Sequence, residues 1–231
     1  MSTGYLVFAR LDSARLPGKA LTDLGGRPLL GRVLDRLRLA AGTRPVIVAT
    51  SDRPVDDPIA AFATADGAPV FRGDCDDVAG RALAAARRFG LERFVRISGD
   101  SPFMDPALCR LMVDLAETGD DDVVTNVFPR GWPPGCSVEI IRTAAMERAV
   151  AAMTDAHDHE HVTPYFYRHA DRFRICNVPP PEALPLVPLT LDTAGDLKVV
   201  RAMMSMAGPK PEAVDIVTLI DIALKCRARE C

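Results

Sequence analysis

Short, almost fully apolar runs alternate with longer amphipathic segments through the first half of the chain. The runs at 5–9, 46–49 and 94–97 are apolar at nearly every position, which is typical of strands covered on both faces. Between them, 30–41 repeats its apolar residues at helical spacing. This alternation predicts βαβ units and an α/β fold, with a mostly parallel, twisted sheet and helices on both of its faces.

The remaining elements follow from the same patterns. Further strands are expected at 69–71, 122–126, 137–141, 173–176 and 189–191. Further helices are expected at 59–66, 77–89, 142–153 and 161–169, and others begin near 105 and 194. After Pro129 the rhythm becomes irregular, but no repeat, low-complexity tract or flexible linker divides the chain. We therefore expect one domain over residues 1–231.

Composition excludes several classes of protein. The formal net charge is −3, whereas a general nucleic-acid binder carries a basic excess. No apolar stretch approaches the ~20 residues that span a bilayer, and the first residues do not resemble a secretion signal. The six cysteines form no C-x-x-C pair. We expect a cytoplasmic protein with reduced thiols, no nucleic-acid partner and no membrane insertion.

The loop after the first strand is rich in cations. Ligands of parallel α/β sheets bind beyond the carboxyl ends of the strands. Arg10, Arg15 and Lys19 lie in this loop, and Gly18 allows close backbone approach, so the loop suits a polyphosphate. It matches neither the P-loop nor the dinucleotide-binding pattern. A solvated basic loop is the alternative.

Carboxylates follow two later strands. Asp100 comes just after the run 94–97, and Asp192 just after 189–191. Two carboxylates from distant strands can share one Mg²⁺ ion, which takes its other ligands from water and substrate phosphate. Such an ion neutralises charge during attack on phosphorus. A helix cap is the alternative role of Asp192, and Asp105 is expected to be a helix cap.

Other strand ends offer weaker candidates. Residues 50–52 supply hydroxyl and carboxylate groups that could contact a base or ribose. Arg72 and Arg81 could donate to a pyrimidine carbonyl, with a surface salt bridge as the alternative. Asp76 or Asp77 is expected to cap the next helix.

Three histidines alternate with acidic residues late in the chain. In a strand, His157, His159 and His161 would share one face and could bind zinc. On a helix only the first and last of them would align. We favour the start of a helix capped by Asp158 or Thr154 over a metal site.

The run Ala9-Arg-Leu-Asp-Ser-Ala-Arg-Leu-Pro-Gly-Lys19 resembles the nucleotide-binding loop A-R-x-x-S-x-R-L-P-G-K of the cytidylyltransferase family. The specific branch is the spore-coat polysaccharide biosynthesis protein F type, related to the CMP-sialic-acid and CMP-Kdo synthetases. The likeness continues in the family's order over nearly the whole chain, at 25–28, 49–52, 71–73, 76–78, 95–102, 105–106, 138–139, 160–165, 191–193 and 196–197.

The resemblance implies a three-layer α/β/α nucleotide-diphospho-sugar transferase fold (GT-A or Rossmann-like) with a mixed sheet. It implies an enzyme that joins CMP from CTP to a sugar or sugar acid and releases pyrophosphate in surface polysaccharide biosynthesis. Asp100 and Asp192 would hold Mg²⁺, and segment 126–170 would carry sugar recognition and homodimer contacts. The catalytic residues would be Arg10, Lys19 and Asp100. The nucleotide-binding residues would be Ala9, Arg10, Arg15, Gly18, Lys19, Thr50, Asp52, Arg72 and Asp77.

The sequence departs from the family pattern at four single positions and in the stretch 186–190, which lacks the usual basic and aromatic residues. Phe8 replaces the usual Gln, Ser137 the usual Asp, and His159 the usual Arg. Asp12 replaces a small residue, usually Gly, and brings a negative charge next to the expected polyanion. Two alternatives therefore stand beside the active cytidylyltransferase. One is a nucleotide-binding homologue with altered catalysis, and the other is a related glycosyltransferase or guanylyltransferase on the same fold.

Overall fold

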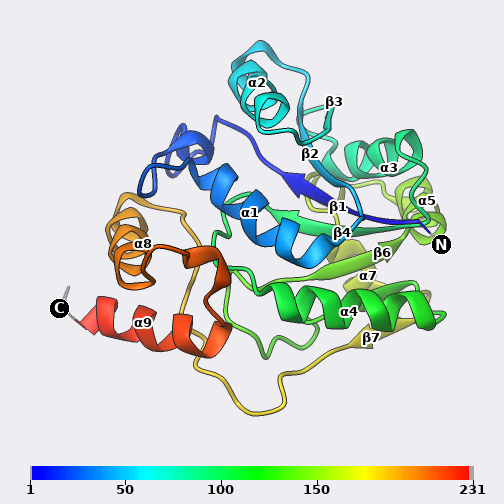
Figure 1. Ribbon diagram of the computed structural model, residues 1–231. Coiled ribbons are helices and arrows are strands. Elements are labelled where there is room, and N and C mark those ends of the chain that lie inside the picture. Colours follow the sequence, from blue (N-terminus) through cyan, green and yellow to red (C-terminus); the bar gives the residue numbers. More distant parts are fainter. Residues whose placement is uncertain (1, 229–231) are drawn as a thin grey trace.

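The computed structural model describes residues 2–228 and contains one seven-stranded sheet with the order β3-β2-β1-β4-β6-β5-β7 (Figure 1). The strands are β1 (Thr3–Phe8), β2 (Val46–Ser51), β3 (Val70–Gly73), β4 (Arg93–Ser98), β5 (Val123–Thr125), β6 (Glu139–Arg142) and β7 (Ile175–Asn177). β6 pairs antiparallel with both β4 and β5, and the other pairs are parallel. The predicted mostly parallel, mixed sheet is confirmed.

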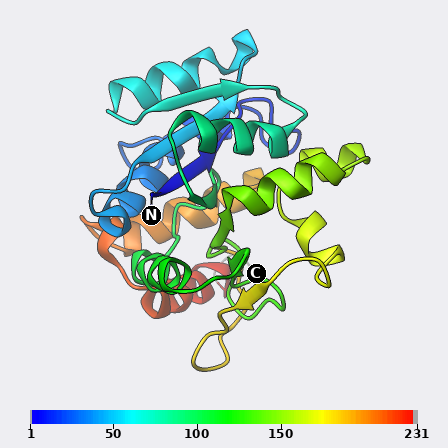
Figure 2. The same ribbon diagram turned by 90° about the vertical axis from the view of Figure 1, so that its right-hand side faces the viewer.

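Helices cover both faces of the sheet (Figures 1 and 2). They are α1 (Leu29–Ala41), α2 (Asp57–Ala65), α3 (Val78–Arg88), α4 (Pro106–Thr118), α5 (Thr143–Ala152), α6 (Ala156–Glu160), α7 (Pro164–Arg168), α8 (Ala194–Met206) and α9 (Ile216–Ala228). Short 3₁₀ turns lie at Lys19–Leu21, Pro54–Asp56 and Pro211–Ala213. This is the three-layer arrangement that the resemblance implies.

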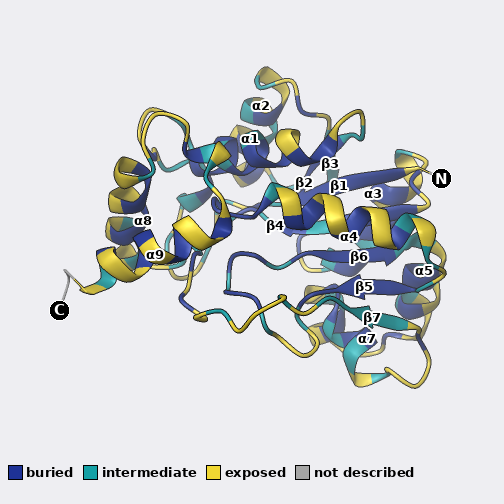
Figure 3. Cartoon of the chain, turned by 60° about the horizontal axis from the view of Figure 1, so that its bottom comes forward, coloured by how far each residue is buried: buried dark blue, intermediate teal, exposed yellow. Residues whose placement is uncertain are grey.

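Side chains that alternate along the central strands supply two separate apolar cores. Val7 and Val48 point to the face that packs against α1, α2 and α4, while Leu6 and Ile47 point to the face under α3, α5 and α7. Figure 3 shows the inner strands largely buried, β7 at intermediate burial, and the exposed turns of α4 facing outward. Successive strand residues alternate between faces, so a strand covered by helices on both sides is largely apolar along its length.

Most predicted elements are confirmed, with boundaries within about two residues of those expected. The predicted caps Asp105 and Asp77 accept bonds from Leu108 N and Gly80 N, both at 2.8 Å. These bonds satisfy donors that the first helical turn leaves without partners.

Three expectations are wrong. Residues 189–191 are not a strand, although Leu191 N donates to Asp100 O at 2.9 Å. The helix expected at 161–169 has the wrong start, because it begins only at Pro164 and forms α7, Pro164–Arg168; a proline lacks the N–H that a preceding helical turn would bond. Asp155, rather than Asp158 or Thr154, caps α6. No element expected from the sequence corresponds to α9.

None of the helices within residues 2–228 combines the length and the apolar character needed to cross a bilayer. Cys75, Cys109, Cys136 and Cys176 carry free thiols, and Cys231 lies outside the described residues.

Gly99 brings the ends of β1 and β4 together. Its N–H donates to Phe8 O at 2.8 Å, and a Cβ at this position would lie 2.7 Å from the same oxygen. Only glycine fits such a close backbone approach without a shift. The loops that leave the two strands therefore begin side by side, at the edge where the functional residues gather.

Candidate active site at the carboxyl ends of β1 and β4

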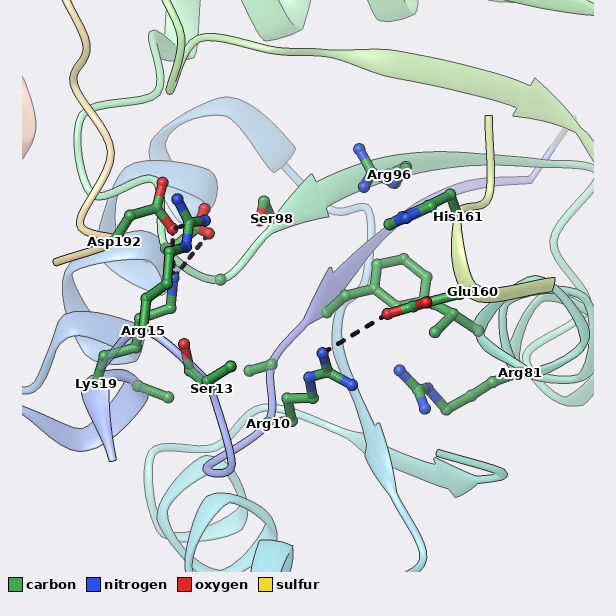
Figure 4. Close-up of a pocket in the computed structure, with 17 residues that line it drawn as sticks. Arg10, Ser13, Arg15, Lys19, Arg81, Arg96, Ser98, Glu160, His161 and Asp192 are labelled. Atoms are coloured by element: carbon green, nitrogen blue, oxygen red, sulfur yellow. Dashed lines mark hydrogen bonds and ion pairs between the residues drawn. The ribbon is translucent and has the colours of Figure 1, made fainter. Parts of the chain in front are cut away.

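A cavity of about 360 Å³ opens where β1 and β4 end (Figure 4). Its basic lining residues are Arg10, Arg15, Lys19, Arg81, Arg96 and His161. Its acidic lining residues are Asp100, Glu160 and Asp192. A site with more cationic side chains than carboxylates suits a polyanion bound together with a metal ion.

The loop after β1 is held in shape by Asp56, in the 3₁₀ turn that follows β2, and by a bond within the loop. Leu11 N donates to Oδ1 of the fully buried Asp56 at 2.7 Å, and Gly18 N closes the loop on Leu11 O at 2.7 Å. Gly18 has φ of 76°, a left-handed conformation that favours glycine. These contacts fix the ends of the loop from which Arg15 and Lys19 reach the cavity.

The extra negative charge of Asp12 is paired inside the same loop. Arg53 Nη2 donates to Asp12 Oδ2 at 2.5 Å, and Arg10 Nε lies 3.7 Å from Asp12 Oδ1. The hydrogen bond from Arg53 lowers the pKa of Asp12 below its usual value. The charge that departs from the family pattern therefore has a cationic partner on the neighbouring loop.

The side chain of Lys19 joins the two predicted metal ligands. Its Nζ donates to Asp100 Oδ2 at 3.0 Å, to Asp192 Oδ1 at 2.9 Å and to Leu191 O at 2.9 Å. Arg15 Nη2 donates to the same oxygen of Asp192 at 2.8 Å. Carboxylates that are distant in the sequence thus converge on Lys19, and Figure 4 shows Lys19 and Arg15 next to Asp192.

These oxygens suit a divalent metal ion. Burial raises the pKa of Asp100, but Lys19 and hydrogen bonds from Ser98 and Ser101 outweigh it, and the net shift is downward. Asp100 is therefore a carboxylate at neutral pH. Within residues 2–228 no three His, Cys, Asp or Glu side chains group as metal ligands. Two carboxylates and a carbonyl are a donor set that Mg²⁺ completes with substrate oxygens and water.

A second part of the cavity lies against α3. The buried side chain of Arg81 donates from Nη1 to the carbonyls of Asp74 and Cys75, at 2.5 and 3.4 Å. Its guanidinium carbon lies 5.9 Å from the centre of the Phe8 ring, and both residues line the cavity. An aromatic face beside a hydrogen-bond donor is suited to a planar heterocycle.

Several lining residues are not among those predicted to contact the nucleotide or the metal. They are Phe8, Ser13, Ala14, Ala20, Val78, Arg96, Ser98, Gly99, Glu160 and His161. Arg96 and Ser98 alternate on β4 ahead of Asp100, so counting back from Asp100 in steps of two would have found them. No comparable sequence signal marks Glu160, which lies 3.9 Å from Arg10 through its carboxylate.

Five of the predicted nucleotide-binding residues do not line this cavity. They are Gly18, Thr50, Asp52, Arg72 and Asp77. Arg72 donates to Arg53 O at 2.9 Å and lies 2.7 Å from the Asp57 carboxylate, so it supports the loop after β2. Asp77 caps α3 and bonds to His159 Nδ1 at 2.8 Å. A direct nucleotide contact of these residues stays a prediction.

Comparison with known proteins identifies the family. Residues 5–199 match the family described as Cytidylyltransferase. The chain is 30% identical to the spore coat polysaccharide biosynthesis protein SpsF of Bacillus subtilis, over 94% of this chain and 93% of the relative. It is 26% identical to the 3-deoxy-manno-octulosonate cytidylyltransferase of Aeromonas salmonicida, over 89% of this chain and all of the relative.

A solved structure agrees with these relatives. The cytidylyltransferase of Leptospira borgpetersenii is 30% identical to this chain and superposes with a TM-score of 0.92, over 99% of this chain and 96% of the other. The sequence match and the shared architecture both extend across the strands and loops that form the cavity. The chain therefore belongs to the cytidylyltransferase family and is a nucleotidyltransferase.

Proposed function

We propose that the protein is a Mg²⁺-dependent cytidylyltransferase that transfers CMP from CTP to a sugar or sugar acid in the biosynthesis of a surface polysaccharide. The observation that carries the proposal is the convergence of Asp100, Asp192 and Lys19, with Arg15 bonded to Asp192. This arrangement pairs two hard acidic ligands with two cations, as the binding of a metal–triphosphate complex requires.

The reaction needs no covalent enzyme intermediate. A hydroxyl oxygen of the acceptor attacks the α-phosphorus in line, and the bond from that phosphorus to the α–β bridging oxygen breaks. Pyrophosphate leaves with the electron pair of that bond, and the hydroxyl proton passes to solvent. Arg10, Arg15 and Lys19 would orient the triphosphate and stabilise the charge that develops on it. Asp100 and Asp192 would hold Mg²⁺, whose charge adds to this stabilisation.

The names of the relatives support the acceptor class. One relative is named for 3-deoxy-manno-octulosonate, a sugar acid, and another for polysaccharide biosynthesis. We assign acceptor recognition and the contacts of a homodimer to segment 126–170. Of this segment, Glu160 and His161 line the cavity.

A ligand screen tests the nucleotide. The protein is heated with Mg²⁺ and CTP, UTP, GTP, ATP or a nucleotide sugar. We expect CTP to stabilise most, by about 2.7 kcal/mol at 100 times its Kd. Stabilisation by none of these ligands would refute the proposal, and preference for a nucleotide sugar would indicate a glycosyltransferase.

A turnover assay tests the chemistry. Pyrophosphate release from CTP is measured with a panel of sugars and sugar acids, before and after removal of Mg²⁺ with a chelator. Asp100→Asn should lower the rate by roughly 100-fold or more, because it removes one charge from the metal ligands. Asp171→Asn, at an exposed position, is the matched control. CTP binding without turnover on any acceptor would instead identify a homologue with altered catalysis.

A further inference from the structure

Arg96 lines the cavity with its guanidinium group (Figure 4). In that view it lies away from Lys19, Arg15 and Asp192. It lies on β4, and its side chain is 28% exposed. Nη1 donates to Glu139 Oε2 at 2.7 Å. Among residues 2–228, Glu139 is the only residue that accepts a hydrogen bond from this guanidinium. The Nε atom of Arg96 has no hydrogen-bond partner among these residues.

Glu139 is built to hold Arg96 in place. The two residues are directly opposite in the antiparallel pairing of β4 with β6, and the Glu139 side chain is 3% exposed. Its second oxygen, Oε1, accepts from the Tyr167 hydroxyl at 2.5 Å. Both oxygens of the carboxylate are therefore engaged, one by the strand neighbour and one by α7.

Tyr167 is itself fixed from two sides. Its hydroxyl bonds to Thr125 Oγ1 at 2.8 Å, and its ring stacks on Phe128 with centres 4.6 Å apart. Burial and the nearby Glu139 raise the pKa of Tyr167, so the phenol keeps the proton that it donates. A chain of contacts thus runs from the sheet and α7 to the guanidinium in the cavity wall.

The remaining N–H groups of Arg96 have no acidic side chain of the cavity as a partner. Asp100 and Asp192 bond to Lys19, and Glu160 lies beside Arg10. Residues 96 and 98 face the same side of β4 and stand about 7 Å apart along the strand. Asp100 follows the end of β4 at Ser98, so Arg96 is displaced from this metal ligand along the strand, towards the part of the cavity that is left for an acceptor if the triphosphate binds at Lys19.

We propose that Arg96 binds the carboxylate of the acceptor and selects sugar acids, with Glu139 and Tyr167 as positioning residues. The proposal rests on the proposed function, because it assumes that CTP occupies the Lys19 end of the cavity. A guanidinium is planar, and with one edge held by Glu139 it offers further N–H groups to a planar carboxylate.

Binding of matched ligand pairs tests the proposal. The wild-type protein is loaded with Mg²⁺ and a non-hydrolysable CTP analogue. It is then titrated with 3-deoxy-manno-octulosonate and other sugar acids, with the carboxamide of each acid, and with sugar 1-phosphates. We expect at least one acid to bind about tenfold or more tightly than its carboxamide, because the amide lacks the charge that the guanidinium recognises.

Variants assign that preference to Arg96. Arg96→Ala should abolish the difference between acid and amide while changing the affinity for the CTP analogue less than about twofold. Arg96→Lys should keep part of it. Arg88→Ala, on the exposed side of α3, is the matched control and should behave as wild type. Tyr167→Phe should weaken acid binding and leave the affinity for the CTP analogue unchanged.

A second variant guards against misfolding. Arg96→Ala leaves a buried carboxylate without its charged partner, which is destabilising. The double variant Arg96→Gln with Glu139→Gln removes both charges and still lacks the guanidinium, so it should fold and show no acid preference. Equal binding of acids and amides by the wild type, binding of sugar phosphates alone, or loss of the preference only in Arg81→Ala would overturn the proposal. Failure to bind the CTP analogue would instead refute the proposed function.

Discussion

Lys19 and Asp192 are 173 positions apart in the sequence, and Lys19 Nζ donates to Asp192 Oδ1 across 2.9 Å. The same ammonium group bonds to Asp100. The lysine therefore lies where the two carboxylates could hold a metal ion. A triphosphate would offer Lys19 another anionic partner and free the carboxylates.

This exchange predicts that metal and nucleotide bind cooperatively. Mn²⁺ should bind weakly to the protein alone and more tightly with CTP, and by linkage CTP should bind more tightly with Mn²⁺. Lys19→Met should raise Mn²⁺ affinity without nucleotide and lower CTP affinity. Electron paramagnetic resonance of free Mn²⁺ measures both effects. Equal Mn²⁺ affinity with and without CTP would contradict this prediction.

The pairing of Asp12 with Arg53 predicts a charge effect on nucleotide binding. Arg53→Ala should weaken CTP binding by about two- to fivefold, because an exposed ion pair is weak and its loss leaves Asp12 facing the phosphates. Adding Asp12→Ala should restore the affinity. Calorimetric titration of CTP into the wild type, Arg53→Ala, Asp12→Ala and the double variant completes a double-mutant cycle. If the two substitutions act additively, Arg53 does not work through Asp12.

Asp66 predicts a pH dependence of stability. Burial raises the pKa of Asp66, but hydrogen bonds from Arg27 and Arg38 outweigh it, and the net shift is downward. A lowered folded pKa stabilises the protein above the unfolded value, near 3.9, and this contribution is lost as pH falls through the folded pKa. Urea unfolding from pH 7 to pH 2.5 should show wild type losing stability relative to Asp66→Asn at the acid end. A constant difference would exclude this role.

Gly99 predicts a steric limit at the strand ends. Gly99→Ala places a Cβ 2.7 Å from Phe8 O, so the ends of β1 and β4 must move apart. We expect a loss of about 1–3 kcal/mol in the free energy of unfolding, measured by urea titration, together with weaker CTP binding. Ala84→Gly, at an exposed position of α3, is the control for an ordinary backbone change. It should lower the free energy of unfolding by about 1 kcal/mol and leave the CTP affinity unchanged. A Gly99→Ala variant with wild-type stability and affinity would show that the backbone relaxes freely.

The architecture could be predicted because its signals are local. The apolar run 46–49 and the helical spacing over 30–41 are local signals of burial against the sheet, and they correspond to β2 and α1. The same local signal wrongly predicts a strand at 189–191. Its leucines are buried, but Leu189 N and Leu191 N bond to Pro134 O and Asp100 O, which lie outside the strands. Burial alone does not specify a strand partner.

The loop containing Arg10, Arg15 and Lys19, and the acidic positions Asp100 and Asp192, could be selected from the sequence by residue type and by their place after apolar runs. Arg96 could not be assigned a partner in this way. Its orientation depends on the β4–β6 register and on α7, because contacts between distant segments exist only after the sheet has formed. The sequence by itself determined the layers and the chemical character of the loops. The tertiary structure decided which charges meet, because side-chain pairing depends on ångström-scale distances that no local pattern encodes.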